Sequence, residues 1–198
     1  MSTICVFCGS SSGNDSAYRD AATELGTAIA HGGHALVYGG GDVGLMGVVA
    51  DAVLAAGGEV TGVITEQLLA LEVGHDSLTA LEVMSDMHTR KARMAELADG
   101  VVVLPGGFGT YEEAFEVLTW NQLGIVSAPI IFLDVRTGEH AAAGVSFFGA
   151  LFDFIDGAVT AGFMKPEHGA LAQHAGDAAA AVEMAAGPAP LFTRKWVG

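Results

Sequence analysis

The sequence predicts an α/β fold, a single Rossmann-like doubly wound parallel sheet with helices on both faces. Short apolar runs alternate with helical patterns from one end of the chain to the other. This alternation is typical of parallel sheets. The apolar runs lack the polar alternation of a half-exposed strand, so we expect strands that are buried on both faces. Three of the runs end in glycine-rich segments, which favours loops gathered at one edge of that sheet.

Each expected strand is a short apolar run that is bounded by turn residues or by a helical pattern. The runs, in chain order, are TICVFCG (3–9), HALVYGG (34–40), EVTGVI (59–64), LTALEVM (78–84), GVVVLP (100–105) and PIIFLD (129–134). The helical patterns lie near 16–30, 43–57, 86–98, 111–124, 145–157 and 175–186. Crossovers between parallel strands are expected to be right-handed.

Length and composition indicate one folded domain. A chain of 198 residues can bury a sizeable core, and a hydrophobic content of 51% with 16% charged residues excludes disorder. We expect residues 1–186 to form that domain and 187–198 to be an irregular tail that holds two of the five prolines. No function is assigned to the tail.

No apolar run approaches the ~18 uncharged residues that a membrane-spanning helix needs. The first residues, MSTICVFCGS, lack a basic leader and a long apolar segment. The expectation is a soluble, cytoplasmic protein without a secretory signal.

The net charge of −15 argues against a nucleic acid or an anionic membrane as partner. A small molecule is the expected partner. Only eight residues are Lys or Arg, and three of them, Arg90, Lys91 and Arg93, fall within four positions.

Cys5 and Cys8 form a C-x-x-C pair inside an apolar run. A redox dithiol normally opens a helix, whereas this pair lies on a strand-like stretch, so two small half-buried strand residues are the preferred interpretation. The seven histidines show no ligand-like pairing. A metal site is therefore not predicted.

The three glycine-rich segments are Gly9–Gly13, Gly39–Gly41 and Gly106–Thr110. Parallel strands place their carboxyl ends at the same edge, so these loops should converge on one crevice. Glycine lets backbone N–H groups approach a ligand closely, and the N-terminus of a following helix favours an anion.

The glycine spacing helps to distinguish a dinucleotide ligand from a nucleoside monophosphate. Gly39, Gly41 and Gly44 match the dinucleotide pattern G-x-G-x-x-G. In dinucleotide enzymes the pattern usually follows the first strand, and an acidic residue ends the next strand. Here it follows the second strand, and the nearest candidate, Glu59, begins the next one. A nucleoside monophosphate fits the loops better than NAD.

Helical spacing places Arg90 on an apolar stripe with Met87, Met94 and Leu97. A charge on such a stripe is costly unless an anion meets it. The alternative is a solvated basic patch in which Arg90 extends its charged end into water.

The segment VVVLPGGFGTYEEAFEVL, residues 101–118, admits two interpretations. Thr110-x-x-Glu113 matches a capping box, in which threonine and glutamate cap their own helix. A capping box requires neither three glycines nor the second carboxylate, Glu112, and it leaves Arg90 without an anion. Thr110 could also cap the helix while Glu113 faces the crevice.

Several of these segments resemble the sequence motifs of one protein family. PGGFGTYEE resembles the P-G-G-x-G-T-x-x-E signature of the Lonely Guy (LOG) family, cytokinin-activating phosphoribohydrolases once misannotated as lysine decarboxylases. MHTRKARM resembles the second motif of that family. CVFCGSSSGND, LVYGGGDVGLMGVVADA and TWNQLG are also similar to it. The resemblance is close over roughly residues 3–135 and weakens beyond.

The resemblance implies hydrolysis of the N-glycosidic bond of a cytokinin riboside 5′-monophosphate or AMP, giving free base and ribose 5-phosphate. It implies no metal and no organic cofactor. The implied catalytic pair is Arg90 and Glu113, with Arg90 expected to lower the pKa of Glu113 and keep it ionised. The candidate substrate-binding residues are Glu72, Lys91, Gly106, Gly107, Phe108, Gly109, Thr110, Tyr111, Glu112, Thr119, Gly9, Ser10, Gly40, Gly41 and Met46.

Two departures from the family pattern are Thr65, in place of a proline, and Leu71, in place of a frequent arginine. The latter puts ribose or phosphate contacts in doubt. A homodimer is expected, because the segment EEAFEVLTWNQLGIV is apolar around more than one helix face. The alternative is a helix buried within one monomer. An alternative function on the same fold is a non-catalytic carrier of a nucleotide or of the molybdenum cofactor.

Overall fold

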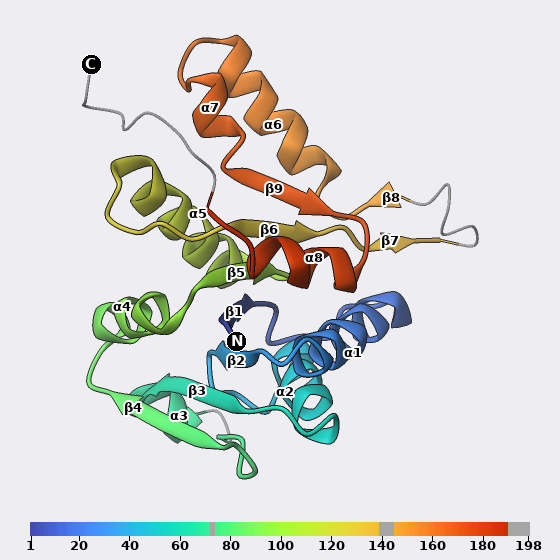
Figure 1. The fold of residues 1–198 in the computed structure, drawn as a ribbon, viewed down its shortest axis with the longest axis vertical. Helices are drawn as coiled ribbons and strands as arrows, with labels where there is room; N and C mark the ends of the chain where they lie inside the picture. The colour runs from blue at the N-terminus through green and yellow to red at the C-terminus, as the bar shows by residue number, and fades with distance from the viewer. Residues whose placement is uncertain (72–73, 139–144, 190–198) are drawn as a thin grey trace.

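The computed structural model describes residues 1–71, 74–138 and 145–189. Seven strands form one sheet in the spatial order β4-β3-β2-β1-β5-β6-β9 (Figure 1). Every neighbouring pair in it is parallel. The strands are β1 (Thr3–Phe7), β2 (Ala35–Tyr38), β3 (Val60–Thr65), β4 (Ala80–Met84), β5 (Gly100–Val103), β6 (Ile130–Leu133) and β9 (Ala172–Ala175).

Six longer helices connect or follow these strands. They are α1 (Ser16–His31), α2 (Gly44–Ala55), α4 (Met87–Leu97), α5 (Phe108–Leu123), α6 (Gly149–Thr160) and α8 (Ala178–Ala185). Two short helices, α3 (Glu66–Leu71) and α7 (Pro166–Gly169), and a small antiparallel pair, β7 (Arg136–Thr137) with β8 (Val145–Ser146), complete the described elements.

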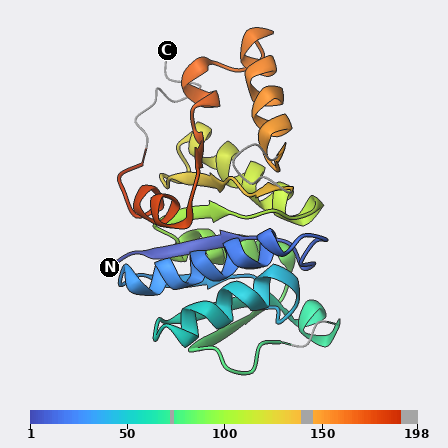
Figure 2. The same ribbon diagram turned by 90° about the vertical axis from the view of Figure 1, so that its right-hand side faces the viewer.

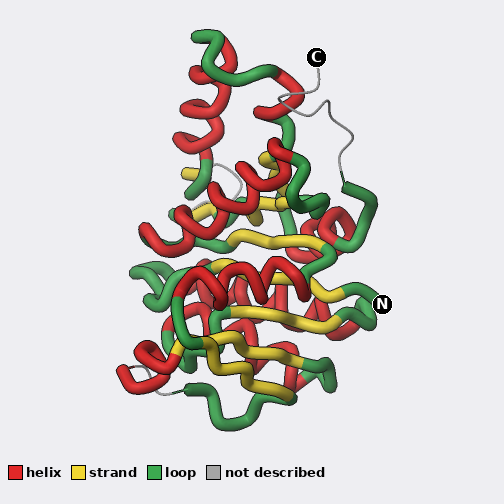
Figure 3. The backbone as a smooth tube through the Cα atoms, turned by 90° about the vertical axis from the view of Figure 1, so that its left-hand side faces the viewer, coloured by secondary structure: helices red, strands yellow, loops and turns green. Residues whose placement is uncertain are grey.

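The predicted doubly wound parallel sheet is confirmed, because the five central strands are buried on both faces, whereas the edge strands β4 and β9 are partly exposed. Along β1, Ile4 and Val6 pack into a core cluster with side chains of α1, α2 and α8. Cys5 and Phe7 point the other way, into a second cluster with residues of α4 and α5. The helices therefore form two outer layers around the sheet (Figure 2), and Figure 3 shows the strands side by side between them.

The strand order reverses between β1 and β5. Ile4 of β1 pairs with Leu36 of β2 on one side and with Gly100 of β5 on the other. In open α/β sheets the ligand crevice lies outside the carboxyl ends of the strands at such a point. The loops after β1 and β5 are thus the first place to look for a site.

The C-terminal third departs most from prediction. Strand β9 was not predicted, because its sequence, AQHA, contains no apolar run. This edge strand is only partly buried, so it does not need one. Helix α8 begins at Ala178 rather than near 175, since the Asp177 carboxylate accepts a hydrogen bond from the Ala180 N–H and caps it. Residues 145–146 are strand, and α6 starts only at Gly149.

Thr65, which departs from the family pattern, ends β3 and caps the next helix. Its hydroxyl accepts a hydrogen bond from the Leu68 N–H at 3.2 Å, and its side chain is buried. The threonine thus gives α3 an N-terminal cap. Leu71, at the end of α3, is exposed.

None of the helices in the described ranges is long and apolar enough to cross a bilayer.

Candidate active site

The loops that follow β1, β2 and β5 meet, as the sequence predicted. The Gly9 N–H donates to the Pro105 carbonyl at 3.0 Å, and the Leu45 N–H donates to the Gly9 carbonyl at 3.0 Å. Gly44 has a positive φ of 60°, and a Cβ added there would lie 2.3 Å from the Ser10 carbonyl carbon. Only glycine allows this close approach of the α2 N-terminus to the first loop.

A cavity of about 290 Å³ lies at the strand-order reversal. Its walls come from the loop after β1, the first turn of α1, the loop after β5, the start of α2 and Phe147, which lies two residues before α6. They include Gly9, Ser10, Gly106 and Gly107, four of the predicted binding residues. The remaining lining residues are Ser11, Ser12, Gly13, Tyr18, Leu45, Pro105 and Phe147.

Helix α5 begins at Phe108, and its N-cap residue is Gly107, which has no side chain to cap it. The capping-box interpretation is therefore wrong, because Thr110 already lies inside the first turn. The Thr110 side chain is buried against Gly106, where an added Cβ would lie 2.1 Å from the Thr110 Oγ1. A helix N-terminus without a side-chain cap leaves N–H groups that can bind an anion.

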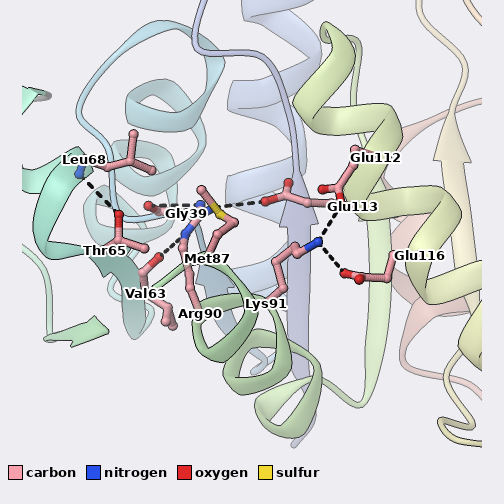
Figure 4. Close-up of polar contacts among 10 residues, drawn as sticks. All are labelled: Gly39, Val63, Thr65, Leu68, Met87, Arg90, Lys91, Glu112, Glu113 and Glu116. Carbon is pink, nitrogen blue, oxygen red and sulfur yellow. Dashed lines mark hydrogen bonds and ion pairs between the residues drawn. The ribbon is translucent and has the colours of Figure 1, made fainter. Parts of the chain in front are cut away.

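Arg90 and Glu113 form an ion pair (Figure 4). Neither side chain lines the cavity described above, and Glu113 lines a separate, smaller cavity together with Lys91 and Glu116. The Arg90 Nη1 lies 3.2 Å from the Glu113 Oε1. The two side chains come from α4 and α5, and they are 8% and 15% exposed. The prediction that Arg90 meets an anion is confirmed, and the solvated-patch alternative is wrong.

The rest of the Arg90 guanidinium is held by backbone carbonyls. Its Nε donates to the Val63 carbonyl at 2.9 Å and its Nη2 to the Gly39 carbonyl at 3.4 Å (Figure 4). A Cβ added at Gly39 would lie 2.5 Å from the Nη2 and 3.3 Å from the Met46 sulfur. Gly39 thus makes room for both side chains, and Met46 lies beside Arg90 as a predicted member of the site.

Burial raises the pKa of Glu113, and the neighbouring carboxylate of Glu112 raises it further. Arg90 and Lys91 act in the opposite direction. Arg90 does lower the pKa of Glu113, as expected. The prediction of a net lowered pKa was wrong, because the loss of solvation on burial raises the pKa by more than Arg90 lowers it. A carboxylate whose pKa moves toward neutrality is a better proton acceptor than an exposed one.

Lys91 lies between two carboxylates of α5. Its Nζ is 2.5 Å from the Glu112 Oε1 and 3.0 Å from the Glu116 Oε2 (Figure 4). Burial lowers the pKa of Lys91, but its hydrogen bonds to both glutamates outweigh this and raise it. The sequence analysis missed Glu116, although its i, i+4 spacing from Glu112 was a usable signal. Lys91 therefore joins α4 to α5, and its predicted contact with the substrate stays a prediction.

The other predicted binding residues lie in the loop after β2 and in the first turn of α5. Gly40 and Gly41 lie in the loop after β2, and Gly41 pairs with Gly74. Tyr111 and Gly109 lie in the first turn of α5, where burial raises the pKa of the tyrosine. Phe108 is 96% exposed.

Thr119 is not brought to the pair. It comes six residues after Glu113 and is displaced by roughly 240° around the helix. Its hydroxyl donates to the Phe115 carbonyl, and the residue lines a separate small cavity that includes Ile155 and Leu171. Glu72 lies outside the described residues.

Cys5 and Cys8 are free and buried, more deeply than the predicted half-burial. Burial raises the pKa of both thiols. The redox alternative needed an exposed pair with thiolate character, so it is wrong.

Asp42, Asp51 and His75 come together beside the loop after β2, a cluster that sequence reasoning missed. Their ligand atoms lie within 4.8 Å of one another. The Ser77 N–H donates to the His75 Nδ1, so the imidazole proton is on Nε2, which faces the Asp51 carboxylate at 3.1 Å. A metal would need that nitrogen unprotonated. The geometry favours a hydrogen bond that ties the segment between α3 and β4 to α2 over a metal centre.

Comparisons with known proteins agree with the sequence motifs. Residues 46–185 match a family model described as "Possible lysine decarboxylase". The chain is 45% identical to the Arabidopsis thaliana cytokinin riboside 5′-monophosphate phosphoribohydrolase LOG1, over 82% of this chain and 72% of the relative. It is 46% identical to the probable enzyme LOGL3 of Oryza sativa subsp. japonica, over the same shares.

Among solved structures, the molybdenum cofactor carrier protein of Chlamydomonas reinhardtii is similar, with a TM-score of 0.68 and 20% identity. The match covers 92% of this chain and 94% of that one. At this identity the likeness shows a shared fold.

Proposed function

The chain belongs to the Lonely Guy family of cytokinin riboside 5′-monophosphate phosphoribohydrolases, and on that premise we propose how its residues act. The enzyme hydrolyses the N-glycosidic bond between a purine-type base and ribose 5-phosphate. The proposed substrates are cytokinin riboside 5′-monophosphates and AMP.

The observation that carries the mechanism is the largely buried Arg90–Glu113 pair, which Arg90 links to the glycine-rich loop after β2 through the Gly39 carbonyl. Cleavage of an N-riboside passes through a transition state with positive charge on the sugar, and a nearby carboxylate stabilises that charge. In the proposal Glu113 supplies that carboxylate and orients or deprotonates the attacking water. Arg90 positions Glu113 and favours the ionised form of its carboxyl group.

The proposed phosphate site is the segment from Gly106 to Thr110, which comprises the end of the loop after β5 and the first turn of α5. Support comes from the start of α5, which no side chain caps, and from the cavity formed by Gly9, Ser10, Gly106 and Gly107. Anchoring the phosphate there would hold the bond to be cleaved in place, which lowers the entropic cost of the reaction.

Two other activities are less well supported. A lysine decarboxylase of the usual kind needs a lysine free to hold pyridoxal phosphate, but Lys91 is paired with two glutamates, and Lys165 lies on the surface beside Glu167. Lys195 lies outside the described residues. A carrier protein would not need the buried carboxylate of Glu113 beside a glycosidic bond.

The direct test is product analysis. Purified protein is incubated with AMP and, separately, with isopentenyladenosine monophosphate, and both free base and ribose 5-phosphate are measured. We expect release of the two products in equal amounts from at least one substrate. Tight binding of both nucleotides without release of base would instead favour the carrier function.

We further propose that the protein forms a homodimer through α5. Phe115, Leu123 and Ile125 leave large apolar surfaces exposed on or just after this helix, which rules out its complete burial inside one monomer. Light scattering at micromolar concentration should give twice the monomer mass. Phe115→Glu should shift the protein toward the monomer, and a monomeric mass for the unmodified protein would contradict the proposal.

A further inference from the structure

A groove of about 890 Å³ runs between α1 and α8, which lie side by side on one face of the sheet (Figure 1). Its floor is made of small apolar side chains, among them Ala28, Ala178, Val182 and Ala186. The groove shares no lining residue with the cavity at the glycine-rich loops, so it is separate from that part of the candidate active site.

The rim of the groove is acidic. Glu24, Asp177 and Glu183 line it, and among its described lining residues there is no lysine or arginine. The groove also contains the end of α1 at His31 and Gly32, where the helix dipole carries a partial negative charge. An occupant should therefore combine apolar side chains with positive charge.

The segment that follows α8 has this composition. The structure describes the chain as far as Ala189, and Ala186, at the end of α8, lies on the groove itself. Residues 190–198, PLFTRKWVG, carry Arg194 and Lys195, no acidic residue, and the large apolar side chains of Leu191, Phe192 and Trp196. In a chain of net charge −15, this concentration of cations and aromatic residues is unusual.

Length permits the segment to return along the groove. Nine extended residues span roughly 30 Å, whereas the eight residues of α8 cover about 12 Å. Pro188 and Pro190 disfavour continuation of the helix, so the chain can turn there.

We propose that residues 190–198 dock into the groove between α1 and α8 of their own chain. Phe192 and Trp196 cover the alanine and valine floor, and Arg194 and Lys195 meet Glu24 and Glu183. The docked segment covers the apolar surface between α1 and α8 in the helix layer on this face of the sheet.

The test uses Trp196 as a probe in the Trp120→Phe protein, where it is the single tryptophan. Docking predicts a blue-shifted emission and acrylamide quenching several-fold weaker than for a free peptide of residues 187–198. Thr27→Phe, which fills the groove, should return both properties to those of the free peptide. Thr160→Phe, on the exposed end of α6, should leave them unchanged. An exposed Trp196 in the unmodified groove would overturn the proposal.

Two further measurements separate the possible occupants. The peptide should bind a chain truncated after Ala189 at one site, and Glu183→Lys should weaken that binding several-fold, whereas Asp153→Lys should not. Protection of Trp196 that disappears on dilution would assign the groove to the tail of a second copy and overturn docking within one chain. Protection that persists in Thr27→Phe would overturn the groove as its site.

Discussion

Replacement of Glu113 by glutamine is expected to reduce base release by about three orders of magnitude while nucleotide binding persists. Glutamine keeps the size of the side chain and can still accept a hydrogen bond from Arg90, but it carries no negative charge and cannot accept a proton. Loss of a carboxylate that stabilises transition-state charge or acts as a general base typically costs on the order of 10²–10⁴ in rate. The measurement is kcat for release of adenine or isopentenyladenine, with nucleotide Kd determined in parallel.

The matched control is Glu96→Gln, an exposed glutamate on α4 that pairs with Arg93 and is remote from the crevice loops. It should leave both kcat and Kd unchanged. Full activity in Glu113→Gln would contradict the mechanism, whatever the fold and family. Loss of binding together with activity would instead assign Glu113 to substrate binding.

Replacement of Arg90 by glutamine is expected to reduce both activity and stability. The change removes the counter-charge of the buried Glu113 and leaves the Val63 and Gly39 carbonyls without their side-chain donor. Breaking a buried pair of this kind typically costs roughly 3–5 kcal/mol in unfolding free energy. Arg93→Gln, three residues along the same helix and in a more exposed pair with Glu82, should destabilise the protein much less, because water screens an exposed ion pair.

The pH profile separates the positioning role of Arg90 from its effect on stability. In the proposed mechanism the active form of Glu113 is ionised, so activity is expected to fall as pH drops through its raised pKa. Arg90 lowers that pKa, and its removal must move the acid limb of kcat/KM to higher pH. Arg90→Lys keeps the charge but lacks the planar set of donors. Its acid limb should therefore lie close to that of the unmodified enzyme, while its maximal rate stays lower. An acid limb in Arg90→Gln at the same pH as in the unmodified enzyme would contradict this assignment.

The strands of the sheet could be predicted wherever burial on both faces left a continuous apolar run, as in GVVVLP. The edge strand β9 could not, because its sequence AQHA faces solvent in part and has no such run. Helix α5 was predicted to start three residues late, since glycines at 107 and 109 are typical of loops. The structure places its first turn at Phe108.

Within the site, the Arg90–Glu113 pairing was predictable because a charge on an apolar stripe requires a partner. The sign of the Glu113 pKa shift was not, since it depends on how deeply the side chain is buried, which no motif encodes. The Lys91–Glu116 contact was also missed, because it depends on how α4 packs against α5. Thr119 was assigned from the family resemblance alone, and the structure places it on another face of α5.

The pairing of β1 with β5 sets Ile4 opposite Gly100 at the middle of the sheet. Contacts between positions this distant along a chain form slowly. During synthesis the N-terminal part leaves the ribosome first, so β1 is present before β5. The proposed catalytic crevice therefore stays incomplete until synthesis has passed α5. Nascent chains shorter than this should have no glycosidase activity, and the free edge of β1 is then a place where chaperones or other unfinished chains could attach.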